Sequence, residues 1–193
     1  MKRLSVLTAA ILCSSLFFSA NAQTVRWYDI KSGILKSVTD DGRSKLETTV
    51  WFDNYGDKQT TIQVTHMPED YGDFKMYMIC KGDKMFSIND YGKEAKESGR
   101  PGINFLDITD EAVSKFKLKE IGEETVMGKK CKVYTHQTKQ LLSTVTITSW
   151  VWKGITLKSS MKNGRREIVT EPVEFKENAK IANSVFEVES YLK

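Results

Sequence analysis

The side chains best suited to catalysis are few and widely spaced in this sequence. His66 and His136 are its two histidines, and Cys80 and Cys131 are the two cysteines that follow residues 1–22. A hydrolytic site needs a nucleophile, a base and a group that orients the base. A reactive thiol also needs surroundings that lower its pKa. Each histidine falls within the alternating pattern of a predicted strand, so we interpret both as polar residues near strand ends.

Motifs of hydrolases, zinc proteases and phosphate-binding loops are absent from the sequence. Three segments, 53–57, 69–73 and 89–93, place Tyr-Gly after acidic or amide residues, and clustered oxygen ligands suit calcium. None has the spacing of an EF-hand loop, and Asn, Asp and Gly favour turns for backbone reasons. The cysteines and histidines also lack zinc-finger spacing. We therefore predict a protein that is not an enzyme and that holds no metal or cofactor.

Cys80 and Cys131 leave two alternatives open. An exported protein meets an oxidising compartment, which allows a disulfide between them. A bridge over this span would stabilise the fold by about 4 kcal/mol in the chain-entropy description. The other alternative is a pair of buried thiols, because free cysteine packs like a small hydrophobe.

Residues 1–22 have the pattern of a secretory signal peptide. Two basic residues precede an apolar stretch, and Ala20-Asn21-Ala22 fits the small-x-small cleavage site. Cys13 follows Leu12, where a lipidation site has a small residue, so we expect no lipid anchor at Cys13. No later stretch is long and apolar enough to span a membrane. We predict a periplasmic or secreted protein, with residues 23–193 as a single domain.

The charge balance gives little indication of a charged partner. The predicted leader contains two of the 29 basic residues and none of the 25 acidic ones, so the remainder is close to neutral. Basic residues are scattered, with short clusters such as Lys129-Lys130. A nucleic-acid-binding surface would gather them into a patch or stripe. We therefore predict no nucleic-acid partner and interpret the charges as a solvated surface.

The rest of the sequence alternates between short strand patterns and turns. The runs are rich in β-branched and aromatic residues and are bounded by Gly, Asp and Asn, which is typical of hairpins. Residues 91–106 lose this pattern and predict a long loop. A short helix follows over 109–117, with Thr109 as its N-cap. The predicted strands cover 24–30, 33–39, 45–53, 58–66, 74–80, 84–89, 120–126, 129–137, 143–152, 155–162 and 166–175, and residues 181–190 predict a polar turn and a short terminal strand.

About ten strands and one helix predict a mainly β protein of the α+β class. Most strands are joined by hairpins, of which the one at Asn163-Gly164 has the strongest turn signal. Pro172 suits an edge or a bulge, because it donates no ladder hydrogen bond. A single antiparallel sheet this wide must curl, close or pair with a second layer.

The stretch "SWVWKGITLKS" (149–159) has apolar side chains on both faces of one strand. Trp150 and Trp152 take one parity and Val151 the other, with Gly154 turning the chain into the next strand. A half-buried strand has apolar residues on one face only. We predict that one face meets a core and that the other lines a pocket.

The second half of the chain resembles the outer-membrane lipoprotein carrier superfamily, the LolA/LolB-like fold. The resemblance covers residues 119–188. It is carried by "EIGEETVMGKKCKVY", "SWVWKGITLKS", a strand after "NG", and "IANSVFEV". It implies an unclosed β-barrel, a half-barrel with one or two helices over its concave face. In the carriers this space holds acyl chains. They also have a helix near the N-terminus and a functional arginine in an early strand, and neither has a match here, so no functional residue is carried over.

We therefore predict an envelope protein that binds a lipid, a lipoprotein acyl chain or another apolar ligand in a concave cavity. The alternative is a module for protein–protein interaction in the envelope, with a filled core and a protein partner. Methionine and aromatic side chains suit variable apolar ligands, although the same residues also fill dry cores. The candidate ligand-binding residues are Trp51, Phe74, Met76, Met78, Phe86, Trp150 and Trp152.

Overall fold

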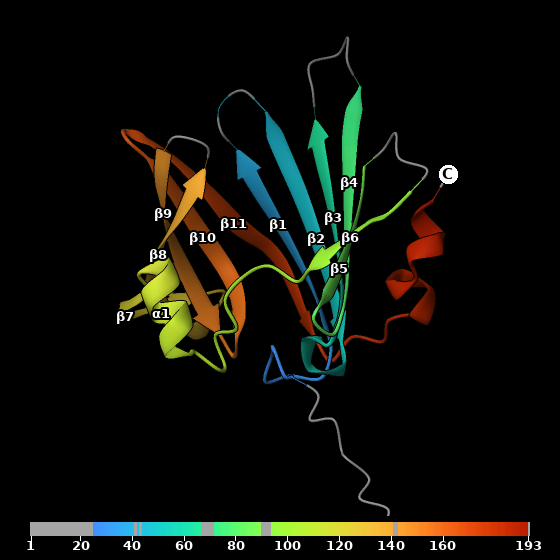
Figure 1. Ribbon diagram of the computed structural model, residues 1–193, viewed down its shortest axis with the longest axis horizontal. Coiled ribbons are helices and arrows are strands. Elements are labelled where there is room, and N and C mark those ends of the chain that lie inside the picture. Colours follow the sequence, from blue (N-terminus) through green and yellow to red (C-terminus); the bar gives the residue numbers. More distant parts are fainter. Residues whose placement is uncertain are drawn as a thin grey trace, which may run out of the picture.

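One eleven-stranded antiparallel sheet dominates the structure, which is a computed structural model (Figure 1). It describes residues 25–40, 42, 44–66, 72–89, 94–140 and 143–192; the predicted leader and Cys13 lie outside these ranges. The strand order is β6-β5-β4-β3-β2-β1-β11-β10-β9-β8-β7. The strands are β1 (Gly33–Asp40), β2 (Lys45–Asp53), β3 (Lys58–His66), β4 (Asp73–Lys81), β5 (Lys84–Asn89), β6 (Lys96–Gly99), β7 (Lys119–Val126), β8 (Lys129–Gln140), β9 (Ser143–Trp152), β10 (Ile155–Asn163) and β11 (Arg166–Glu177).

The sheet is unclosed, because β6 and β7 form its two edges, and the predicted fold class is confirmed. Its strands are interrupted by register shifts in β7, in β10, and where β11 passes β1. In β11, Pro172 pairs with Ser37 and Glu174 with Lys36, so Val173 is the extra residue of a bulge. The prediction that Pro172 suits a bulge is thus confirmed. Bulges bend strands and increase twist, which curves a wide sheet.

Three predicted elements differ from the structure. Residues 25–32 form an irregular segment in place of a strand, because their N–H groups bond to turns: Tyr28 N to Tyr55 O at 3.0 Å and Asp29 N to Lys153 O at 3.0 Å. The predicted loop 91–106 contains the short exposed strand β6. The predicted last strand is two 3-10 helices, η2 (Asn183–Phe186) and η3 (Val188–Tyr191).

Side chains alternate between an inner, concave face and an outer face of the sheet. In β2, Val50 and Phe52 point inward, while Trp51 pairs with Thr60 on the outer face. Residues 100–109, which we call the strap, cross the inner face and lead into α1 (Asp110–Phe116) in front of β8 and β9 (Figure 1). Thr109 Oγ1 accepts a hydrogen bond from Ala112 N at 3.2 Å, so the predicted N-cap is confirmed.

Gly154 turns the chain between β9 and β10, as predicted. Its φ is +82°, and a Cβ atom there would lie 2.3 Å from the carbonyl oxygen of Trp27. Only glycine fits such a close approach at positive φ. This contact fixes the 25–32 segment against the β9–β10 turn, at one end of the inner face.

The C-terminal 3-10 helices cover the outer face of β3 and β4. Phe186 is 1% exposed, and Thr60 Oγ1 donates a hydrogen bond to Val185 O at 2.7 Å. The rings of Tyr77 and Tyr191 lie 5.0 Å apart, centroid to centroid. The tail therefore supplies the outer half of the core that β3, β4 and β5 need, because Ile79 and Ile88 are also buried.

Phe186→Ala is expected to lower the free energy of unfolding by about 3 kcal/mol, because it removes a fully buried ring and leaves a cavity. Urea denaturation followed by circular dichroism measures the change. Val173→Ala is the matched control, since Val173 is 62% exposed at the bulge and should shift the stability by less than about 0.5 kcal/mol. Equal stability of the two variants would contradict the packing described for the tail.

Candidate functional site

A cavity of about 890 Å³ opens on the inner face, beneath the strap and beside α1. Its size is within the range of small-molecule sites, about 300–1,000 Å³. Its apolar lining comes from β1, β2, β4, β5, β9 and β10, from α1, from the 25–32 segment and from the strap. The lining residues are Trp27, Tyr28, Leu35, Val50, Phe52, Gln59, Thr61, Met78, Cys80, Met85, Arg100, Pro101, Gly102, Ile103, Phe105, Lys115, Phe116, His136, Thr138, Ile147, Ser149, Gly154, Ile155, Thr156 and Ser159.

Arg100 is the polar anchor of the strap and lines the cavity. Its Nη1 donates to Gly56 O at 2.6 Å, its Nη2 donates to Gln59 Oε1 at 3.0 Å, and its guanidinium carbon lies 4.0 Å from the centroid of the Trp27 ring. Its backbone N–H donates to Asp83 O at 2.6 Å. These contacts join the strap to the turns beside β2 and β5, and they place a cation at one end of an apolar cavity.

Burial keeps the ionisable neighbours of Arg100 neutral. The pKa of Tyr28 is raised, chiefly by burial and against the effect of the Arg100 charge; Tyr28 OH donates to Gln59 Oε1. The pKa of the Cys80 thiol is also raised by burial, again against Arg100. Neither group therefore supplies a negative charge opposite the guanidinium at neutral pH.

His136 lies at the α1 side of the cavity, on β8. Its Nδ1 is buried and has no hydrogen-bond partner within the described part of the chain, and its ring meets Phe116 edge-on at 6.4 Å. Burial lowers the pKa of His136. A buried imidazole nitrogen that has no partner can donate to, or accept from, a polar group of a bound ligand.

Of the predicted ligand-binding residues, only Met78 lines the cavity. Phe74 and Met76 share its parity on β4 but lie beyond the cavity, nearer the start of the strand. Trp51 points to the outer face. So does Phe86, which pairs with Ile79; its neighbour Met85 pairs with Cys80 and lines the cavity instead.

Trp150 and Trp152 also belong to the outer parity of their strand, so the predicted assignment of faces was reversed. Val151 is the inward residue and packs with Ile103 and Phe105 of the strap. Trp150 Nε1 donates to Glu124 Oε2 at 2.7 Å, and the ring of Trp152 meets Phe175 edge-on at 5.9 Å. The two tryptophans are partly buried, pack against the core cluster and do not line the inner-face cavity, so both faces of this strand make apolar contacts.

Sequence reasoning missed the contribution of the 25–32 segment and of the strap. Trp27 and Tyr28 lie in a segment that was predicted as a strand but is irregular, and Arg100 and Phe105 lie in the predicted loop, so strand parity gave no correct indication of where they point. The available signal was the aromatic and basic content of the irregular stretches themselves. "RWYDI" and "GRPGINFL" are richer in such groups than a solvated loop needs.

Cys80 and Cys131 are both buried free thiols in the structure. They lie on β4 and β8, which are not neighbours in the sheet. Burial raises the pKa of each thiol. The structure thus contains the second of the two alternatives that the sequence left open, and the candidate disulfide is not formed.

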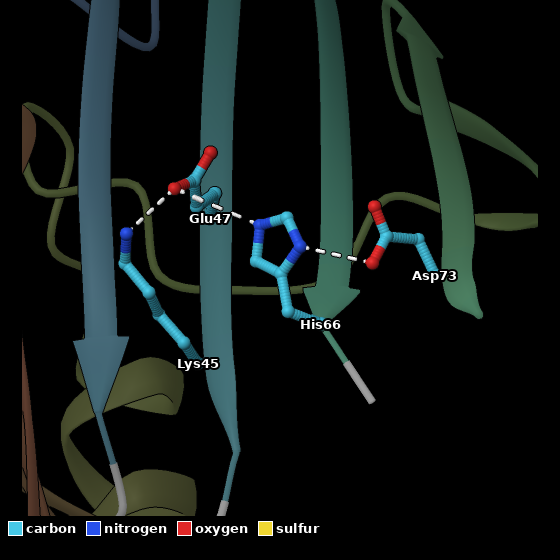
Figure 2. Close-up of polar contacts among 4 residues, drawn as sticks. All are labelled: Lys45, Glu47, His66 and Asp73. Carbon is cyan, nitrogen blue, oxygen red and sulfur yellow. Dashed lines mark hydrogen bonds and ion pairs between the residues drawn. The ribbon is translucent and has the colours of Figure 1, made fainter. Parts of the chain in front are cut away.

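His66 lies outside the cavity, among charged residues at the ends of β2, β3 and β4 (Figure 2). Its Nδ1 is 3.0 Å from Asp73 Oδ1 and its Nε2 is 3.6 Å from Glu47 Oε1. Lys45 Nζ donates to the same Glu47 oxygen at 2.8 Å and lowers the pKa of that carboxyl. The four side chains form an exposed ion-pair network, and no cluster of metal-ligating side chains occurs within the described ranges. The same ranges contain no helix long and apolar enough to cross a membrane.

No sequence family matches the chain, and no curated protein matches it. Solved structures similar to it include an uncharacterized conserved protein from Thermus thermophilus (8% identity, 80% of this chain and 82% of that chain, TM-score 0.49). A DUF1329 family protein from Desulfovibrio piger is 14% identical over 86% of this chain and 92% of that chain, with a TM-score of 0.43. A putative outer membrane lipoprotein-sorting protein domain from Vibrio parahaemolyticus is 10% identical over 86% of this chain and 92% of that chain, with a TM-score of 0.40. Such low scores carry no functional information.

Both thiols are expected to remain unreactive in the folded protein and to be alkylated after denaturation without reductant. Burial removes them from the reagent and disfavours the thiolate that reacts. Iodoacetamide labelling followed by peptide mass mapping locates each modified cysteine. A Cys80–Cys131 peptide pair joined by a disulfide would contradict this expectation.

Acidification is expected to destabilise the protein partly through His136. Its pKa is lowered in the folded state from the usual 6.5, so below pH 6.5 the unfolded chain binds more protons and the free energy of unfolding falls. His136→Gln should lose less stability than the wild type between pH 7 and pH 5. Parallel urea denaturation at both pH values measures this, and identical losses would show that His136 contributes nothing.

Proposed function

We propose that the protein binds a lipid or another apolar ligand in the inner-face cavity and acts in the cell envelope without catalysing a reaction. The observation that carries the proposal is the cavity itself, with about 890 Å³ of open volume lined by aromatic, aliphatic and methionine side chains. Apolar lining with a few placed polar groups is the usual composition of a ligand site.

The segments that pack on the two faces of the sheet support the same proposal. The outer face of β3 and β4 is packed against the C-terminal tail, while the inner face is only bridged by the strap and α1. α1 has no buried residue, and Val113 in it is 41% exposed. A filled interior, as the alternative of an interaction module requires, would need side chains in the volume that remains open.

The chemistry of the lining supports binding over catalysis. Ser149, Ser159, Thr61 and Thr138 supply hydroxyl groups, but no hydrogen bond in the described part of the chain joins one of them to His136, whose buried Nδ1 has no partner there. A nucleophile must lie within hydrogen-bond reach of its base. The polar groups are therefore suited to orienting a ligand.

Met78→Lys is expected to weaken the binding of a neutral apolar probe, N-phenyl-1-naphthylamine, by roughly tenfold or more, because it places a charge in the apolar lining. Fluorescence titration of the purified protein, stripped of lipid, measures the affinity. Met76→Lys is the matched control: it lies on the same strand and face, is 36% exposed, and lies outside the cavity, so it should bind like the wild type.

Native mass spectrometry of the protein purified from its own envelope, followed by lipid extraction, tests the same proposal without a probe. A reproducible adduct that is present in the wild type and Met76→Lys, and lost in Met78→Lys, is expected. A bare polypeptide mass together with no saturable probe binding would overturn the proposal.

A further inference from the structure

We propose that the ligand is an amphiphile with an anionic headgroup, a carboxylate or a phosphate, and that Arg100 binds this headgroup. The inference rests on the proposed function and goes further by naming the charge of the ligand and the residue that recognises it.

The first support is the charge of the cavity lining. Among the described residues that line it, Arg100 and Lys115 are cationic and none is a carboxylate, although the sequence has 25 acidic residues. The positive field inside the cavity is therefore not balanced by its own walls. A concave site lined by one sign of charge concentrates ligands of the other sign.

The second support is the set of partners that Arg100 has. They are the carbonyl oxygens of Gly56 and Gly82, at 2.6 and 3.5 Å, and the amide oxygen of Gln59, at 3.0 Å. All three are neutral, and within the described chain no carboxylate pairs with this guanidinium. Lysines of the sheet differ, because Lys36 and Lys158 each pair with a glutamate at 2.7 Å.

The third support is the number of donors that remain. A guanidinium has five N–H donors in a planar fork, and the three contacts use two on Nη1 and one on Nη2. The Tyr28 hydroxyl also interacts with the guanidinium, which leaves one N–H donor without an acceptor within the described part of the chain. A carboxylate or phosphate oxygen accepts such a charge-assisted bond, which makes arginine well suited to these groups.

The apolar surroundings of Arg100 explain why the anion should carry a chain. Trp27 stacks on the guanidinium at 4.0 Å, and Cys80, Met78 and Met85 line the same cavity. The neutral Tyr28 and Cys80 leave the charge uncompensated. A half-buried cation without a counter-ion is costly, and an anionic headgroup would offset that cost while its chain covers the apolar lining.

Arg100 also holds the strap, and that structural role predicts no ligand preference. A ligand series on the wild-type protein separates the two roles without any mutation. The series is hexadecanoate, hexadecyl phosphate, hexadecan-1-ol and hexadecyltrimethylammonium, together with inorganic phosphate, each displacing N-phenyl-1-naphthylamine at pH 8. The chains have equal length, so differences in affinity report the headgroup.

The expected result is that at least one of the two anionic amphiphiles binds about tenfold or more tightly than the alcohol, with the cation weaker still; this is the size expected for a hydrogen bond to a charged group. The carboxylate and phosphate arms show which headgroup is preferred. Inorganic phosphate should not displace the probe. Displacement by inorganic phosphate as strong as by the amphiphiles, or equal affinity for the anions and the alcohol, would overturn the inference.

Arg100→Gln should reduce the ratio of anion affinity to alcohol affinity to about unity, whatever its effect on both affinities through the strap, whereas Arg100→Lys should retain part of the preference. Lys115→Gln is the control for general positive charge, and this variant should keep most of the preference for the anion. An Arg100→Gln variant that keeps the wild-type ratio of anion affinity to alcohol affinity would show a purely structural role and overturn the inference. If no member of the series and no probe binds the wild type, the proposed function itself fails; if the alcohol binds as well as the anions, only the present inference fails.

Discussion

The interrupted pairing of β10 with β11 is the constraint on which the shape of the molecule depends. The two strands pair over Ser159–Asn163 and Arg166–Thr170, while β11 continues along β1 as far as Glu177. The residues of β10 that precede Ser159 in the sequence pair only with β9 within the described chain. An eleven-stranded sheet cannot stay flat, and here it bends where its ladder is interrupted, so that its two halves lie at an angle around the inner face (Figure 1).

The place where the two strands diverge is packed with apolar residues from β8, β9, β10 and β11. Leu157 and Cys131 are buried there, with Trp152 and Phe175 packed against them. Lys129 pairs with Glu177 and lies 4.2 Å from the centroid of the Trp152 ring, so it covers the outer side of these residues. The apolar outer face of β9 thus maintains the bend, and the inner face, through Val151, receives the strap.

Strand parity explains both the success and the failure of the sequence-based predictions. Alternation located most of the regular strands, and capping chemistry located the helix at Thr109. Parity states which residues share a face, but it does not state which face is concave. That depends on the bulges and on which segment covers each side, so Trp150 was assigned to the cavity when it lies in the outer core.

The irregular segments were the least predictable part, and they determine the chemistry of the cavity. Trp27 and Arg100 are brought together by contacts to turns: Tyr55 O holds Trp27 N at 3.0 Å, and Gly56 O holds the guanidinium. Tyr55 itself adopts a left-handed φ of 58°. Such contacts depend on where distant strands end, which no local pattern encodes.

Arg100 combines the two properties that the proposed binding of an anionic amphiphile requires. Through Gly56, Gly82 and Trp27 it fixes the strap over the inner face, so the cavity has a roof. Through its remaining donor and its charge, the guanidinium offers a polar contact inside that roof. A cation that were fully paired by protein carboxylates would hold the strap equally well but would leave nothing for a headgroup. The neutral partners of Arg100 are therefore the feature that distinguishes a ligand site from a structural clamp, because carbonyl and amide oxygens position a guanidinium without neutralising it.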